Sequence, residues 1–176
     1  MHAKALAVLT ASAGLVLGMA QPARAVTQSI FAYSNPAGSC QLSIPTTNTG
    51  VRPKATGFRN EGAVSNFVIC GYTKASNSST FFKSIVLGII SMDGADHAVS
   101  CTAVTGLQGQ YPPVYSSATI TATANGSLSY KIWVPSDFGS GDTMIPNAYE
   151  PSVTCNLPPQ VSITYLAGNY DLDVGT

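Results

Sequence analysis

The feature that most constrains the fold of this chain is the lack of helical spacing among its apolar residues beyond residue 25. Gly, Pro, Ser and Thr interrupt every long window there, so no stretch lines up apolar residues on one face of a helix. Short runs occur instead, either alternating or wholly apolar, and turn residues bound them. The chain therefore predicts an all-β protein built from many short strands.

The spacing of these runs favours an antiparallel β-sandwich, with a jelly roll or a barrel as the alternative. The clearest expected strands cover residues 40–44, 66–73, 81–92, 97–105, 118–124, 127–134, 153–157 and 161–165. The run 81–92 is the most apolar, which is typical of a strand covered on both faces. Gly88 inside it predicts a bulge, and the residues 106–117 predict a loop.

The N-terminus predicts a cleavable export signal. Met1–Lys4 is short and positive, an apolar run follows from Ala5 to Met19, and Ala23 and Ala25 have the small side chains that a signal peptidase requires. The run is too short for a membrane anchor, which needs roughly 20 residues. We expect cleavage after Ala25, leaving one domain over residues 26–176 in a secreted or periplasmic protein.

Four cysteines, all beyond residue 25, predict two disulfides in an exported chain. The long spacings between them do not suit a metal site, which needs closely paired ligands. Four cysteines allow three connectivities. We favour the pairing of sequence neighbours, Cys40 with Cys70 and Cys101 with Cys155.

The composition excludes several classes of partner. Charged residues make up only 9% of the chain, against about 25% in ordinary soluble proteins, and Ser and Thr are abundant. A surface this poor in basic residues does not suit nucleic acid, whose phosphates must be neutralised, or anionic membranes. No second apolar stretch is long enough to span a membrane.

A hairpin around Asn125-Gly126 predicts which residues are exposed. A two-residue turn would mix both faces, whereas a three-residue loop gathers the apolar side chains of residues 118–124 and 127–134 on one face. We therefore expect the longer loop, with Gly126 in the left-handed region. In that register Trp133 and Lys131 lie on the outward, hydroxyl-rich face.

Aromatic residues are the best indication of a binding site. Trp133 is expected on the outward face beside Lys131, and Tyr111, Tyr115 and Tyr149 are expected in loops. Rings on an uncharged, hydroxyl-rich surface suit stacking on sugars or contact with an extracellular protein. The alternative for Trp133 is burial beneath a neighbouring loop.

Several short segments resemble a loose group of small exported bacterial proteins of unknown function with four cysteines. They are Cys40, Gly57-Phe58-Arg59-Asn60, Phe67-Val68-Ile69-Cys70, Val99-Ser100-Cys101-Thr102, and the segment from Tyr149 through Thr154-Cys155-Asn156-Leu157-Pro158-Pro159. Several members carry Cys-Pro-Leu where this chain has Cys70-Gly71-Tyr72. The resemblance implies a sandwich and the same disulfide pairing, and it supplies no catalytic residues.

No catalytic or metal-binding pattern stands out. His97 is the one histidine beyond residue 25, and the sequence has no G-x-S-x-G motif for a nucleophile. With the cysteines oxidised, one histidine is too few for zinc. Asp137 and Asp142 could contribute to a calcium site, but ordinary turn aspartates explain them more simply. We predict no catalytic residue, no metal and no cofactor.

Three functions remain open. The first is an exported, non-catalytic binding or surface-structural module whose ligand is unknown, a glycan being one candidate. The second is a secreted inhibitor that binds a protein partner. The third is a secreted hydrolase with an unrecognised site, which the poverty in histidine and charge disfavours.

Overall fold

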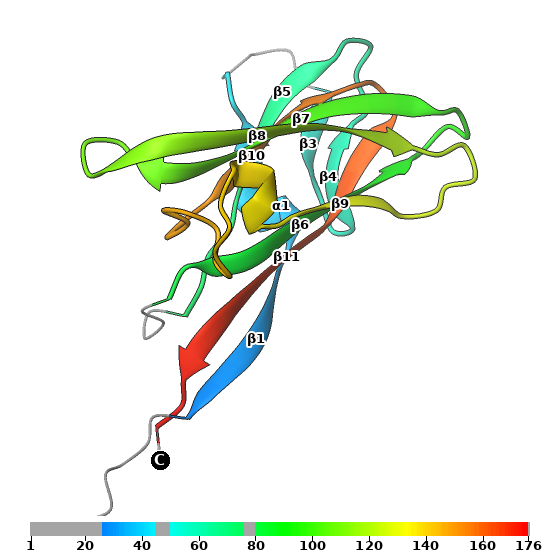
Figure 1. Ribbon diagram of the computed structural model, residues 1–176. Helices are drawn as coiled ribbons and strands as arrows, with labels where there is room; N and C mark the ends of the chain where they lie inside the picture. Colours follow the sequence, from blue (N-terminus) through cyan, green and yellow to red (C-terminus); the bar gives the residue numbers. More distant parts are fainter. Residues whose placement is uncertain (1–25, 45–49, 76–79, 176) are drawn as a thin grey trace, which may run out of the picture.

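The computed structural model describes residues 26–44, 50–75 and 80–175, and there it shows two antiparallel β-sheets packed as a sandwich (Figure 1). This confirms the all-β prediction; the sheets do not close into a barrel. The predicted signal peptide and its cleavage site lie outside the described residues.

The first sheet has the strand order β3-β4-β11-β6-β9, and β1 also pairs with β11. Its strands are β1 (Thr27–Ser34), β3 (Val51–Lys54), β4 (Gly57–Asn60), β6 (Phe82–Ser91), β9 (Ser129–Trp133) and β11 (Val161–Asp173). β11 is central because it pairs with β6 on one side and with β4 and then β1 on the other.

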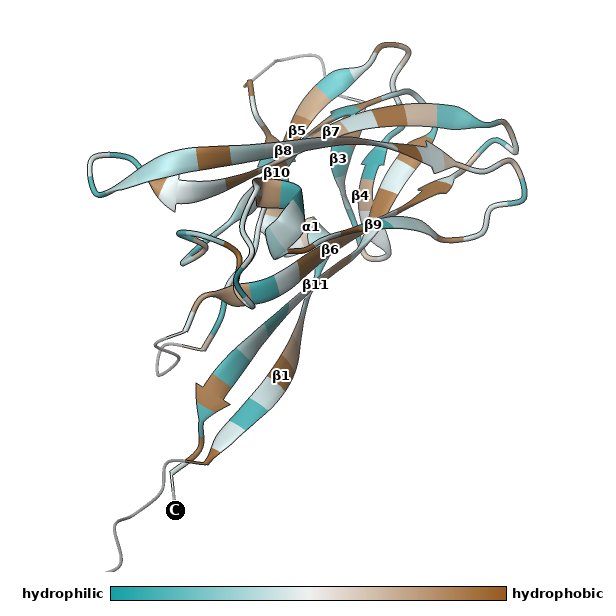
Figure 2. Cartoon of the chain, viewed as in Figure 1, coloured by the Kyte–Doolittle hydropathy of each residue, from teal (hydrophilic) through white to brown (hydrophobic). Residues whose placement is uncertain are grey.

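The second sheet has the order β2-β5-β10-β7-β8. Its strands are β2 (Cys40–Leu42), β5 (Asn66–Gly71), β7 (His97–Leu107), β8 (Tyr111–Ala122) and β10 (Ser152–Leu157). Along β7, buried residues alternate with exposed or half-buried ones, as a strand covered on one face requires. Figure 2 shows apolar and polar residues interspersed along the strands of both sheets. Two short helical turns, α1 (Pro36–Ser39) and η1 (Pro135–Phe138), complete the described elements.

Both disulfides join neighbouring strands of the second sheet. Cys40 lies opposite Cys70 in the β2–β5 pair, and Cys101 lies opposite Cys155 in the β7–β10 pair, each with a Cα–Cα distance of 4.0 Å. The predicted pairing is confirmed. The described residues hold no free cysteine.

Side chains from both sheets fill the space between them. Ile85, Leu87 and Ile89 of β6 are fully buried. Tyr72 is buried as well, and its hydroxyl donates to the carbonyl oxygen of Val86 at 3.0 Å. Burial raises the pKa of Tyr72 far above its usual value, so the phenol stays a hydrogen-bond donor at any physiological pH.

Asn60, the last residue of β4, has a buried side chain that links two strands of different sheets. Its side chain is fully buried, and its Nδ2 donates to the carbonyl oxygens of Leu157 at 2.8 Å and Val64 at 2.9 Å. Its Oδ1 accepts from the Gly62 N–H at 2.9 Å. A buried amide must be satisfied in this way, and here it ties β4 to the end of β10.

Three details of the strand prediction are wrong. β8 begins at Tyr111, inside the expected loop; because β8 is an edge strand, it tolerates Pro112 and Pro113. The bulge expected at Gly88 lies instead on the partner strand, where the β11 register shifts between Ile163 and Tyr165. Strands β1, β3 and β4 were not predicted.

The prediction of a hairpin around Asn125-Gly126 is also wrong. β8 pairs with β7 in the second sheet, whereas β9 pairs with β6 in the first, so this turn connects the two sheets. Gly126 has a φ of +68°, in the left-handed region as expected, and its N–H donates to the Thr123 carbonyl oxygen at 3.1 Å. Because the two strands do not pair, their apolar faces need not coincide.

Candidate functional site: a tyrosine cluster at one end of the sandwich

The β7–β8 hairpin projects from one end of the sandwich and carries Tyr111 and Tyr115 (Figure 1). Its tip is a tight turn in which the Gln110 N–H donates to the Leu107 carbonyl oxygen at 2.9 Å. Gly109 supplies the positive φ of +83° that this turn needs. The hairpin therefore holds Tyr111 at the start of β8, next to its tip.

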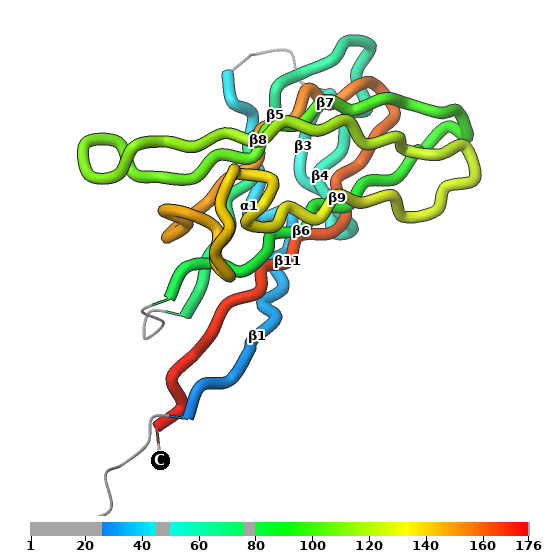
Figure 3. Tube along the Cα trace, viewed as in Figure 1, coloured from blue at the N-terminus to red at the C-terminus, as the bar shows by residue number. Residues whose placement is uncertain are grey.

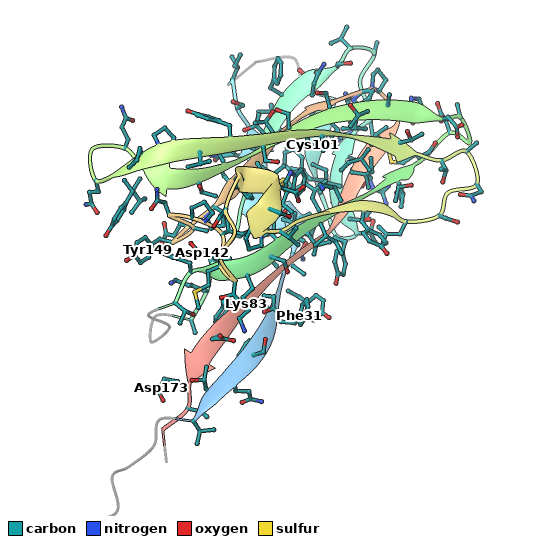
Figure 4. The ribbon with its side chains drawn as sticks, in the orientation of Figure 1. Phe31, Lys83, Cys101, Asp142, Tyr149 and Asp173 are labelled. Carbon is teal, nitrogen blue, oxygen red and sulfur yellow. A yellow bond between two sulfur atoms is a disulfide. The ribbon has the colours of Figure 1, made fainter. Side chains whose placement is uncertain are left out.

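The loop before β10 brings Tyr149 to the same place. Asn147, with a φ of +55°, accepts from the Gly106 N–H at 3.0 Å and donates from its side chain to the Pro112 carbonyl oxygen at 3.2 Å. These two bonds fix the loop to the hairpin. Figure 4 labels Tyr149 at this end of the molecule.

Tyr149 is the centre of an aromatic cluster. Its ring lies 5.3 Å from that of Tyr111 and 4.6 Å from that of Phe81, the latter edge to face. The ammonium of Lys74 lies 5.1 Å from the centre of the same ring, within the range of a cation–π interaction. Lys74 also donates to the Thr80 carbonyl oxygen.

The side-chain hydrogen bond with Tyr111 raises the pKa of the Tyr149 hydroxyl above its usual value. Desolvation lowers the pKa of Lys74, and the nearby carboxylate of Glu150 opposes that shift. The polar groups of this cluster are the hydroxyls of Tyr111 and Tyr149, the amino group of Lys74 and the carboxyl group of Glu150.

Two surface hollows meet at Tyr111. One, of about 450 Å³, is lined by Lys74, Leu107, Gln110, Tyr111, Tyr149 and Glu150. The other, of about 630 Å³, is lined by residues 104–106, 108–113 and 115. Amide side chains of Gln108 and Gln110 border these hollows beside the rings, so each hollow combines an aromatic surface with hydrogen-bonding groups.

The structure does not bring Trp133 and Lys131 to this site. Both lie on β9 in the other sheet, and Trp133 is fully buried opposite Ile85. They share a face, as predicted, but that face points inward. Lys131 lies at its margin, where its ammonium pairs with Asp137 at 3.1 Å. The prediction that Trp133 is exposed is wrong, because β9 pairs with β6 and not with β8.

The remaining charged candidates have structural partners. His97 contacts Asp93 at 2.9 Å, and this hydrogen bond lowers the pKa of Asp93 to about 2. Asp96 accepts from the Ala124 N–H at 2.6 Å, and Asp137 accepts from the Val134 N–H at 2.9 Å. In the part of the chain that the structure describes, no three histidine, cysteine or acidic residues gather at a metal-binding distance.

Sequence reasoning missed the outer face of the first sheet. Leu128, Tyr130 and Ile132 are exposed there, although the predicted hairpin placed them in the core. Residues 128–134 carry apolar side chains on both faces of the strand. The sequence pattern therefore indicates that one apolar face is exposed but does not show which one.

Comparison of the chain with models of protein families, with curated proteins and with solved structures gave no match. The resemblance to small exported four-cysteine proteins therefore stays a prediction. Among the described residues, no helix is long and apolar enough to cross a membrane.

Proposed function

We propose that the chain is an exported, non-catalytic binding module and that its tyrosine cluster, which consists of Tyr111, Tyr115 and Tyr149, binds a glycan. The observation that carries this proposal is the position of two tyrosine rings beside amide and charged side chains at the tip of a projecting hairpin. Sugar recognition needs such a combination, because a pyranose has an apolar ring face and a rim of hydroxyls.

The three tyrosines have different parts in this site. Tyr149 is half-buried, and its ring already contacts Phe81, Tyr111 and Lys74; its part is to hold Tyr111 in place. Tyr111 and Tyr115 are exposed, Tyr115 by 62%, and they offer free ring surface. Large exposed rings on a surface with so few charges are typical of contact sites.

The two exposed tyrosines border one surface hollow together with Gln108 and Gln110. Each ring can supply an apolar contact and each amide a hydrogen bond, and this combination supports a sugar as the ligand.

Export is part of the proposal and rests on two supports. The N-terminal sequence has the order of regions that a signal peptide requires. The two disulfides are typical of proteins that fold outside the cytoplasm.

A glycan array with the purified protein, followed by titration of the best oligosaccharide, tests the proposal. We expect Tyr111→Ala and Tyr115→Ala each to weaken binding by roughly 3- to 10-fold, the contribution of one aromatic contact. Tyr130→Ala is the matched control, since Tyr130 is 60% exposed but lies on the other sheet.

Two results would overturn the proposal. One is the absence of binding to any glycan on the array. The other is a ligand whose affinity falls with Tyr130→Ala and not with the two hairpin variants.

A further inference from the structure

The outer edge of β1 is an open row of backbone hydrogen-bonding groups. Within the described residues β1 pairs with β11 alone, in an unbroken register from Thr27 opposite Asp173 to Ser34 opposite Leu166. Figure 3 shows β1 and the end of β11 leaving the body of the sandwich as a two-stranded ribbon. The side of β1 away from β11 is accessible along this ribbon.

The hydrogen-bonding pattern between β1 and β11 shows which backbone N–H and C=O groups of β1 point away from β11. The Val174 N–H donates to the Val26 carbonyl oxygen at 3.0 Å, so residues 26 and 174 form a hydrogen-bonded pair. Such pairs alternate along an antiparallel ladder. Residues 28, 30, 32 and 34 therefore bond to β11, and Thr27, Ser29, Phe31 and Tyr33 present their N–H and C=O groups to the open side.

β1 lacks the features that normally protect an edge strand. Its eight residues include no charge, no proline and no bulge. By contrast, the edge strand β3 contains Arg52, Pro53 and Lys54, and the edge strand β2 has only three residues. β8 carries two prolines directly after its first residue and contacts β9 and η1.

Exposed rings stand beside the open edge. Phe31, labelled in Figure 4, is 55% exposed, and Tyr33, two residues further along the same face of the strand, is 69% exposed. Tyr33 contacts Tyr165 edge to face with ring centres 5.7 Å apart, which holds its ring upright on that face. Apolar side chains at an unprotected edge favour pairing with another strand.

We propose that β1 pairs with β1 of a second copy of this chain, antiparallel, across a two-fold axis beside Ile30. In this register Thr27 lies opposite Tyr33 of the second copy, and Ser29 lies opposite Phe31 of the second copy. All four outward residues of each strand then form hydrogen-bonded pairs, each exchanging two bonds. The first sheet continues from one copy into the other.

Self-pairing is favoured by the composition of β1. At a two-fold axis beside Ile30, the residues next to the axis lie close to their own copies, so a charge there would lie close to a like charge. β1 has none. Ile30 would lie opposite Ile30 of the second copy in a pair without hydrogen bonds, where side chains are closest and β-branched residues pack well.

The interface would be small. It consists of one strand edge and the flanks of four rings, less than the roughly 1,200–2,000 Å² of a standard interface. We therefore expect a weak dimer that dissociates on dilution.

Sedimentation velocity on the purified, disulfide-intact protein over a wide concentration range tests the proposal. We expect a monomer at low micromolar concentration and a reversible dimer toward millimolar concentration. Ser29→Pro removes an N–H that points to the open edge and leaves the β11 ladder intact, so we expect at least 10-fold weaker dimerisation. Ser29→Ala is the matched control, since both variants lose the bond from the serine hydroxyl to Asn169, and it should dimerise like the wild type.

The melting temperatures of the two variants show whether Ser29→Pro still folds; they should agree within a few degrees. A protein that stays monomeric at millimolar concentration would overturn the proposal. Dimerisation that survives Ser29→Pro and is lost with Tyr130→Ala would also overturn it, because the contact would then lie on the face of β9. Neither result bears on glycan binding by the tyrosine cluster.

Discussion

Trp133 and Tyr130 lie on the same strand and face opposite sides of the first sheet, so truncating each in turn tests the register of β9. Trp133 is fully buried, and a tryptophan side chain buries about 150–250 Å². At about 25 cal/mol per Å² this corresponds to roughly 4–6 kcal/mol, close to the roughly 3–5 kcal/mol found for such truncations. We expect Trp133→Ala to lower the free energy of unfolding by about 4 kcal/mol.

Tyr130→Ala is the matched change on the other face. Because the Tyr130 ring is 60% exposed, we expect a loss of about 1 kcal/mol or less. In a domain of this size, 1 kcal/mol shifts the melting temperature by about 2–4 °C, so the two variants should differ by roughly 6–12 °C.

Guanidinium unfolding followed by far-ultraviolet circular dichroism measures both losses. Fluorescence is unsuitable, since Trp133 is the single tryptophan. The disulfides must stay intact. Equal losses, or a larger loss for Tyr130→Ala, would refute the inward position of Trp133 and restore the hairpin that the sequence pattern favoured.

Three further predictions concern stability. Replacing Cys101 and Cys155 together by Ala should lower the free energy of unfolding by about 4 kcal/mol, as expected for a bridge that closes a loop of 54 residues; the same titration measures it. Asn60→Ala should cost roughly 2–4 kcal/mol, because three hydrogen bonds to a buried amide are lost, and a cost near zero would contradict its bonding role. The pKa of Asp93 falls from 3.8 to about 2 on folding, so its contribution to stability is complete above pH 4 and is lost as the pH falls toward 2. The melting temperature of Asp93→Asn should therefore fall less than that of the wild type over this interval, and parallel curves would contradict the contribution.

The parts of the fold that followed from the sequence are those set by local pattern. Alternating and apolar runs predicted β5, β6, β7 and β10 to within a few residues, and cysteines near each other in sequence predicted the disulfides. Strand β1 was missed because its alternation is weak: Ile30 and Ala32 on the inner face are only half-buried, while Phe31 and Tyr33 on the outer face are exposed.

The orientation of β9 could not be predicted from its own residues. Tyr130 and Ile132 on one face are about as apolar as Trp133 on the other, so the pattern fits both orientations. The choice depends on β6, which supplies Ile85 opposite Trp133, a residue 48 positions further along the chain.

The residues of the candidate site could be predicted from the sequence, but their grouping in space could not. Exposed tyrosines could be singled out by residue type, and Tyr111, Tyr115 and Tyr149 do lie at one end of the sandwich. Their grouping depends on Asn147, a loop residue whose side chain donates to the carbonyl oxygen of Pro112 on β8. No local pattern in the sequence reports a contact of that kind.

The ribbon of β1 and β11 has a consequence for the order of folding. The Ser29 hydroxyl donates to Asn169, 140 residues further along the chain. Closing so long a loop costs more entropy than closing the shorter loops within the sandwich, and contacts of this range form slowly. We therefore expect β1 to join its sheet last. During refolding its amide hydrogens would be the last to gain protection from exchange, and an almost complete sandwich would precede them with its first strand still loose.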